Sequence, residues 1–300
     1  MLRIFLFIVI NFFINITLSI ILHSIGVHHN NILNILLISG ILGCLGSIIS
    51  LLLSKWIALK TVNGYILKNS YNSKNNWILK YVYQKSLLMK IKTPDIAIYN
   101  SLDLNAFATG FSKNNSLIAL STGLLNSMSK KNIKAVLAHE LCHIENGDML
   151  TMTLIQSILN TFIIFFSHFF AKIFEKILFK NKKSEKNKFL FFSNSIFYFF
   201  ISLILEFTFG ILANIIIMWF SRKREFYADA GAANIVGKKN MISALLSLKK
   251  SVEPNIISNL KPFYIHGNTK KFLNLFLSHP TIDDRILALK NNIFYKKSII

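Results

Sequence analysis

Two histidines and a glutamate form the most chemically informative motif in this 300-residue chain. His139 and His143 are four residues apart, so on a helix both imidazoles lie on one face, where they can hold one zinc ion. Glu140 follows the first histidine and is placed to act as general base toward a zinc-activated water. The alternative is a solvated helix face, but a chance match is rare in a chain with only eight histidines. The motif predicts a zinc-dependent hydrolase that needs a third protein ligand.

Acidic residues are scarce, with 13 Asp and Glu in the whole chain, and five of them lie in two short stretches. Glu140, Glu145 and Asp148 form the first stretch, and Glu225 and Asp229 form the second. Glu225 can supply the third ligand, and Asp229, one helical turn later, can hydrogen-bond a ligating histidine and fix its tautomer. The alternative for Glu225 is an acid favoured by the dipole of a helix N-terminus.

The histidine motif needs a helix, and the flanking residues supply its ends. Ser129 is a suitable N-cap and Gly147 a suitable C-cap for a helix that runs to Asn146, while Asp148 is positioned to cap the next helix. Cys142 points away from the histidines on such a helix and is predicted to lie in the core. Apolar spacing over residues 76–89 predicts another helix, and two short β-like runs at 96–99 and 117–121 predict a small antiparallel sheet.

The composition is that of a membrane protein. Hydrophobic residues make up 53% of the chain and charged residues 16%, whereas soluble domains carry about 25% charged residues. Residues 4–22 and 32–53 are uncharged and long enough to cross a bilayer as a hairpin. Residues 149–171 and 189–221 form a second pair, in which Glu206 is the only charge. The predicted fold class is therefore mainly α: an integral membrane protein with about four transmembrane helices and a soluble zinc-binding domain with a small antiparallel β-sheet.

Four segments follow from this plan: a transmembrane hairpin (1–54), a soluble part with the zinc-binding helix (55–148), a second helix pair (149–221) and a soluble part with the third ligand (222–300). Loop charge conflicts with four crossings, because the connection 172–188 is rich in Lys and would lie outside the cell. His139 and Glu225 must nevertheless reach one ion, so the runs between them either both cross or both fail to cross. We expect both to cross.

The formal charge of +21 does not indicate a nucleic-acid partner. Thirty of the 34 cations are Lys and four are Arg, and the Lys residues are scattered rather than gathered on one face. A basic surface near anionic lipid headgroups is the better use of this charge, so membrane lipid is the expected partner. The two cysteines, Cys44 and Cys142, suggest no disulfide framework.

The sequence also resembles the HtpX family, membrane-integrated zinc metalloproteases of the gluzincin clan that are related to the CAAX prenyl proteases. The resemblance covers nearly the whole chain. It rests on ordered motifs at residues 51–56, 105–110, 121–125, 139–148 with the following Met-Leu-Thr-Met-Thr-Leu-Ile-Gln, 218–222, 225–229, 278–280 and 285–286. It implies a cytoplasm-facing endopeptidase of the bacterial inner membrane that cleaves damaged or misassembled membrane proteins in quality control, as part of the stress response.

The resemblance also implies roles for individual residues. His139, His143 and Glu225 take the positions of the ligands to one zinc ion per subunit, and Glu140 takes that of the general base. Asp229 takes the position that orients a ligand. His279 matches a histidine that stabilises the oxyanion in related enzymes, although a simple turn residue before Pro280 is the alternative.

One segment could bind an extended peptide. Proteases commonly bind substrate as an added strand, because backbone hydrogen bonds tolerate varied side chains. An edge strand near the zinc would do this, and the candidate consists of Asn105, Ala106, Phe107, Ala108, Thr109 and Gly110. An ordinary turn into a hairpin is the alternative.

Two other functions are alternatives to a protease of membrane or unfolded proteins. A zinc-bearing membrane scaffold would have no use for the general base Glu140. A prenyl-protein protease shares the motifs, but we expect it to carry a larger membrane chamber with more spans than the four predicted here. Membrane or unfolded proteins are therefore the expected substrates.

Overall fold

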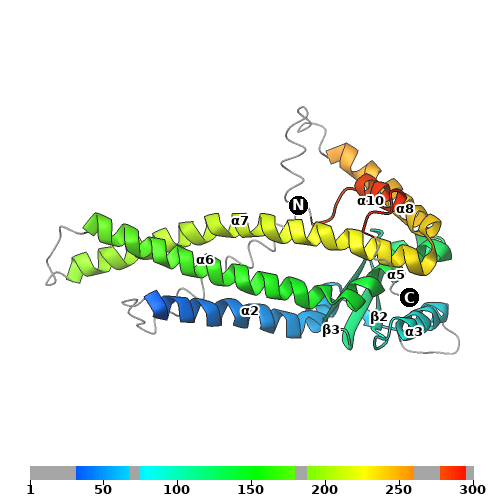
Figure 1. Ribbon diagram of the computed structural model, residues 1–300, viewed down its shortest axis with the longest axis horizontal. Coiled ribbons are helices and arrows are strands. Elements are labelled where there is room, and N and C mark those ends of the chain that lie inside the picture. Colours follow the sequence, from blue (N-terminus) through cyan, green and yellow to red (C-terminus); the bar gives the residue numbers. More distant parts are fainter. Residues whose placement is uncertain (1–31, 68–74, 180–187, 260–277, 295–300) are drawn as a thin grey trace. The chain divides into compact units, whose positions relative to one another are not determined.

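The computed structural model describes residues 32–67, 75–179, 188–259 and 278–294 (Figure 1). The described chain divides into two compact units. We call residues 32–49 and 153–217 the helical unit, and residues 50–152 and 218–294 the α/β unit. Helices α2 (Ile32–Thr61), α6 (Asp148–Phe179) and α7 (Lys188–Val236) each contribute to both units.

These same three helices are long and apolar enough to span a membrane, over Leu36–Thr61, Asp148–Leu178 and Ile196–Val236. They correspond to three of the four predicted apolar runs. The remaining run, at residues 4–22, lies outside the described residues. The prediction of a mainly helical membrane protein is confirmed, with three candidate spans in the described chain.

Polar residues inside the helical unit face other helices. The Asn160 side chain on α6 donates to Ser47 on α2 at 3.4 Å. His168 on α6 is 4% exposed and its Nδ1 lies 2.9 Å from the hydroxyl of Tyr198 on α7. Its Nε2 lies 3.6 Å from Glu206, which is also buried. Partnering of this kind reduces the cost of polar groups in lipid.

The sheet lies in the α/β unit and contains strands in the order β1-β2-β4-β3. Its members are β1 (Tyr65–Ile66), β2 (Asp95–Tyr99), β3 (Ala106–Ser112) and β4 (Asn115–Ser121). The prediction of a purely antiparallel sheet is wrong, because β2 and β4 pair in parallel. β4 is buried from Ser116 onward and therefore takes a central position, which leaves β3 at the edge. After β2 the chain forms the edge strand β3, and a hairpin then returns it as β4, which lies between β2 and β3.

Alternation along the strands separates two faces of the sheet. Ile96, Ile118 and Leu120 pack in the main core beneath α5 (Lys130–Asn146) and α3 (Asn76–Leu88). Ala97 and Leu117 belong to a smaller cluster on the other face. Helices α4 (Thr122–Ser127), α8 (Lys238–Asn259) and α10 (Ile282–Lys290) complete the unit, with α8 packed against both α5 and α10.

The predicted caps of the histidine helix are present. The Ser129 hydroxyl accepts from the Asn132 amide, and Gly147 ends α5 with a left-handed φ of 69°. Cys142 is buried in the core, as expected. The cap predicted for Asp148 differs, because Asp148 is itself the first residue of α6 and its carboxylate turns to His143.

Candidate metal centre

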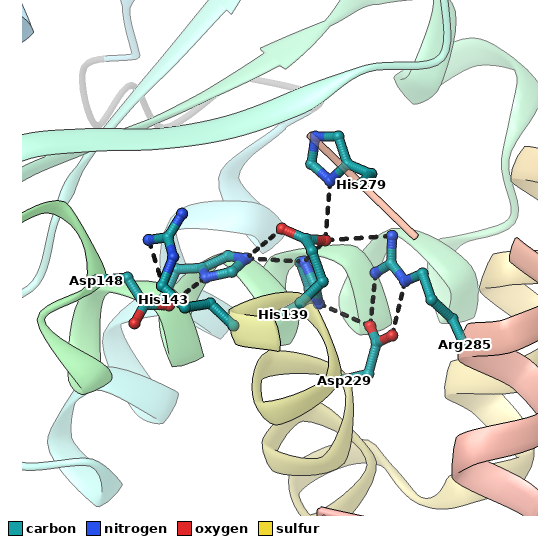
Figure 2. Close-up of polar contacts among 8 residues, drawn as sticks. His139, His143, Asp148, Asp229, His279 and Arg285 are labelled. Carbon is teal, nitrogen blue, oxygen red and sulfur yellow. Dashed lines mark hydrogen bonds and ion pairs between the residues drawn. The ribbon is translucent and has the colours of Figure 1, made fainter. Parts of the chain in front are cut away.

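Three side chains of the α/β unit converge as metal ligands would. The Nε2 atoms of His139 and His143, one turn apart on α5, are 3.1 Å from each other. Glu225 on α7 places one carboxylate oxygen 3.3 Å from Nε2 of His143 and the other 3.5 Å from Nε2 of His139. Figure 2 shows the imidazoles of His139 and His143 side by side, with Asp229 and Arg285 next to His139 and Asp148 next to His143.

The residue types and their separations fit a metal ion. Zinc binds His nitrogen at about 2.0–2.1 Å, so two nitrogens on one tetrahedral ion are about 3.3–3.4 Å apart. The two Nε2 atoms, 3.1 Å apart, are close to that value, and each of them lies near a different oxygen of the Glu225 carboxylate. One ligand atom from each of His139, His143 and Glu225 lies within 4.8 Å of the others, so the three side chains can hold one ion.

A buried network orients the first histidine. Nδ1 of His139 lies 2.9 Å from Oδ1 of Asp229, one turn after Glu225 on α7. Arg285 of α10 donates two hydrogen bonds to the Asp229 carboxylate, at 2.6 and 2.7 Å, and its third nitrogen lies 3.3 Å from Glu225. Only 1% of the Asp229 side chain and 10% of the Arg285 side chain are exposed. We call His139, Asp229 and Arg285 the first relay.

A second set of the same residue types orients the other histidine. Nδ1 of His143 lies 2.5 Å from Oδ2 of Asp148, and Arg224 lies 3.8 Å from that same oxygen. Asp148 begins α6, whereas Arg224 precedes the ligand Glu225 on α7. We call His143, Asp148 and Arg224 the second relay.

The relays also set the protonation of the metal-free site. Burial alone would lower the pKa of His139, but hydrogen bonds to Asp229 and Glu225 outweigh it and raise this pKa to about 10. The pKa of His143 is likewise raised against its burial, through Asp148 and Glu225. Burial would raise the pKa of Glu225, yet hydrogen bonds with histidines hold it well below its ordinary value. Because zinc binds neutral imidazole, metal binding must release protons.

Glu140 differs from the other acids of the site. It is 7% exposed, and within the described part of the chain its carboxylate has no hydrogen-bond or ion-pair partner. A carboxylate without a partner beside a candidate metal ligand is available to exchange protons, which indicates a chemical use.

His279 lies at the open side of the site. Its Nδ1 is 3.0 Å from Oε2 of Glu225, and 64% of its side chain is exposed. The substrate-binding candidate at residues 105–110 falls mostly on β3, the edge strand. No strand in the described ranges pairs with the outer edge of β3. Gly110 has φ 138°, and a Cβ there would meet the Asn115 carbonyl at 2.3 Å, so this turn of the strand requires glycine.

Asp148, Arg224 and Arg285 contribute to the site although sequence patterns do not predict it. The sequence identifies Asp148 as one of the clustered acids but predicts a helix-capping role for it. Arg285 carries a usable signal, because it is one of four Arg in a chain that uses Lys for almost every cation. The rigid, planar guanidinium suits a cation that contacts two carboxylates.

The model of peptidase family M48 matches residues 72–293, which include every residue of both relays. The chain belongs to peptidase family M48. It is therefore a metallopeptidase, and the resemblance to the HtpX family is confirmed by relatives of almost equal length.

Protease HtpX of Wigglesworthia glossinidia brevipalpis is 52% identical over 297 residues, which cover 99% of this chain and 100% of the relative. Protease HtpX of Serratia proteamaculans is 45% identical over 297 residues, with the same coverage. The crystal structure of S. mikatae Ste24p resembles the M48 chain with a TM-score of 0.59 at 20% identity, over 91% of this chain and 61% of that one. This last likeness shows a shared fold.

Proposed function

We propose that the protein is a zinc-dependent endopeptidase of the bacterial inner membrane, with its active site facing the cytoplasm. In this proposal it cleaves damaged or misassembled membrane proteins and unfolded chains. The observation that carries the proposal is the convergence of His139, His143 and Glu225, with one ligand atom of each within 4.8 Å of the others, beside the unpartnered carboxylate of Glu140. A structural metal site has no need of such a base.

His139, His143 and Glu225 would hold the zinc ion. When bound, zinc would act as a Lewis acid that polarises the scissile carbonyl and lowers the pKa of a water molecule, so that the water can lose a proton and attack the carbonyl carbon. Asp148 is hydrogen-bonded to Nδ1 of His143, and Asp229 forms an ion pair with Nδ1 of His139 at 2.9 Å, so each carboxylate would keep the Nε2 atom of one histidine directed at the metal.

Glu140 is the proposed proton carrier. Its carboxylate takes a proton from the attacking water and delivers it to the leaving amine. His279, exposed at the open side, is proposed to donate to the carbonyl oxygen as negative charge develops there. The edge strand from Asn105 to Gly110 is proposed to align the substrate backbone.

The decisive test compares Glu140→Gln with wild type in purified, detergent-solubilised protein. The variant keeps all three ligands, so zinc content measured by metal analysis should stay the same. Cleavage of casein or of a model membrane protein should fall by about 10²–10⁴-fold or more. Cleavage at the wild-type rate would remove Glu140 from the mechanism, and loss of zinc would show that it serves the metal instead.

A further inference from the structure

Two tryptophans of the α/β unit stand in the same unusual setting. Trp56 on α2 is 61% exposed and Trp219 on α7 is 51% exposed. Each carries a lysine four residues later over its ring, Lys60 at 5.8 Å and Lys223 at 5.3 Å. Exposed tryptophan is unfavourable in water, but its ring is favoured at the level of lipid headgroups.

Both tryptophans lie where an apolar helix becomes charged. The uncharged part of α2 ends just before Lys55, and that of α7 ends just before Arg222. Lysine side chains next to such a boundary reach toward anionic headgroups, while their stems cover apolar surface. The two Trp–Lys pairs therefore have the composition of an interfacial anchor at the charged ends of the apolar stretches of α2 and α7.

The metal centre is tied to the same boundary. Glu225 follows Trp219 by six residues on one continuous helix, a rise of about 9 Å. Asp148, which contacts His143, is the first residue of candidate span α6. The candidate ligand Glu225 and the residue Asp148 thus both lie within about 10 Å, measured along their helices, of the ends of the apolar stretches of α7 and α6.

The sheet is attached at this level as well. Lys55, one residue before Trp56, contacts both Asp95, which begins β2, and Asn115, which begins β4. The edge strand β3 ends next to that point, because Ser112 is paired with Asn115. One end of the proposed substrate-binding edge therefore starts at the same charged boundary.

We propose that Trp56 with Lys60 and Trp219 with Lys223 anchor the α/β unit to anionic lipid headgroups, and that the metal centre consequently acts on peptide segments within about 10 Å of the bilayer surface. The substrate reach rests on the peptidase function proposed above. The anchor does not, since it involves no residue of the metal centre.

The chain supplies its own control. Its third tryptophan, Trp77 on α3, also has a lysine over its ring, Lys130 at 5.8 Å, but it is packed against the main core. Three single-tryptophan proteins can therefore be made by replacing the other two with Phe. Glu140→Gln in each background removes cleavage from the measurement.

The first test reconstitutes these proteins in vesicles of phosphatidylethanolamine and phosphatidylglycerol that contain a nitroxide quencher either on the headgroup or deep in the acyl chain. Headgroup quencher should reduce the fluorescence of Trp56 and Trp219 several-fold more than the deep quencher does. Neither quencher should affect Trp77. Stronger quenching of Trp219 by the deep probe, or quenching of Trp77 equal to that of Trp219, would overturn the anchor.

The charge requirement is tested by replacing phosphatidylglycerol with phosphatidylcholine. Quenching of Trp219 by the headgroup probe should fall, and Lys223→Gln should abolish the difference between the two lipids. Lys130→Gln is the matched control and should change nothing. Equal quenching in both lipids would remove anionic headgroups from the proposal.

The second test uses active protein and a single-span substrate with a long unstructured tail, in the same vesicles. Cleavage sites mapped by mass spectrometry should gather within about the first ten residues outside the lipid, since 10 Å corresponds to about three extended residues and the site needs several more. Cleavage spread evenly along the tail would overturn the surface reach. Correct quenching without any cleavage would instead refute the peptidase function and leave the anchor standing.

Discussion

The two relays perform the same task with different electrostatics. In the first relay, the charge of Asp229 is balanced by two short hydrogen bonds from Arg285 in a buried setting. In the second relay, Arg224 lies at 3.8 Å from Asp148, and the N-terminus of α6 supplies the rest of the stabilisation for that carboxylate. A carboxylate that depends on one guanidinium should be more vulnerable than one that is supported by a helix dipole.

The largest expected effect comes from breaking the first relay at its arginine. Arg285→Met leaves Asp229 buried with its main counter-charge removed, which should lower the stability of the metal-free protein by about 3–5 kcal/mol. Thermal unfolding in detergent measures this. Asp283→Asn, which removes an exposed ion pair between α10 and Lys249, is the control and should change stability by less than about 1 kcal/mol. Equal effects of the two variants would mean that Arg285 only helps to dock α10.

The next effect concerns metal affinity and compares the two carboxylates directly. Losing an orienting carboxylate typically costs about 10–100-fold in metal affinity. The loss of affinity in Asp229→Asn should lie near the upper end of this range, because the substitution also removes the carboxylate that accepts two hydrogen bonds from Arg285. The loss in Asp148→Asn should lie near the lower end. Competition with a chelator gives both constants. The opposite order would show that the second relay is the more important one.

A third prediction follows from the raised pKa values of the two imidazoles. Because their pKa values are raised, the metal-free imidazoles keep their protons at a pH above the ordinary pKa of histidine, and His139 does so up to a pH of about 10. Zinc must displace these protons when it binds. At pH 8, Asp229→Asn should lower the His139 pKa and reduce the protons released on zinc binding by up to about one. Calorimetry in buffers of different ionisation enthalpy counts them. An unchanged count would show that Asp229 does not hold this proton.

The same linkage gives a stability profile with a fixed sign. Protonation of His139 stabilises the metal-free fold. This stabilisation is fully present at a pH below about 6.5 and is lost as the pH rises through the folded-state pKa of about 10. The metal-free protein should therefore become less stable as the pH rises from about 6.5 to about 10. Zinc-loaded protein should not show this loss, because its His139 is already neutral.

The smallest effect is expected for Arg224→Met. Its ion pair with Asp148 is long, at 3.8 Å, so stability should fall by less than it does when the two short hydrogen bonds of Arg285 are removed. Zinc affinity should change by less than it does in Asp148→Asn. A loss as large as that of Arg285→Met would make the two relays equivalent and refute the contrast between them.

Local signals were sufficient for some parts of the molecule. The helix α5 is specified by its caps Ser129 and Gly147, and the two histidines follow from their spacing. The three candidate spans follow from uninterrupted apolar runs. Each of these features is encoded by neighbouring residues, so a pattern in the chain is enough to reveal it.

Long-range arrangement was the part that sequence patterns missed. β2 and β4 pair in parallel because β4, rather than β3, takes the central position in the sheet. β4 is central because its side chains are buried on both faces of the sheet. Arg285 contacts Asp229, which lies 56 residues earlier in the chain. Its residue type is unusual in this Lys-rich chain, but no spacing pattern predicts which carboxylate it contacts. The acids of the candidate metal site were visible through their scarcity, but their partners required the folded structure.

Because α7 is one continuous helix, insertions and deletions within it should change the direction in which the Glu225 side chain points. Each residue of an α-helix turns its successor by about 100°, so deleting one residue between Trp219 and Glu225 would rotate the carboxylate away from the histidines while leaving every side chain of the site present. An insertion would do the same in the opposite sense. Apart from Lys223 and Arg224, the residues of this interval should tolerate substitution, whereas the gain or loss of a single residue should not be tolerated, because it changes the direction of the Glu225 side chain.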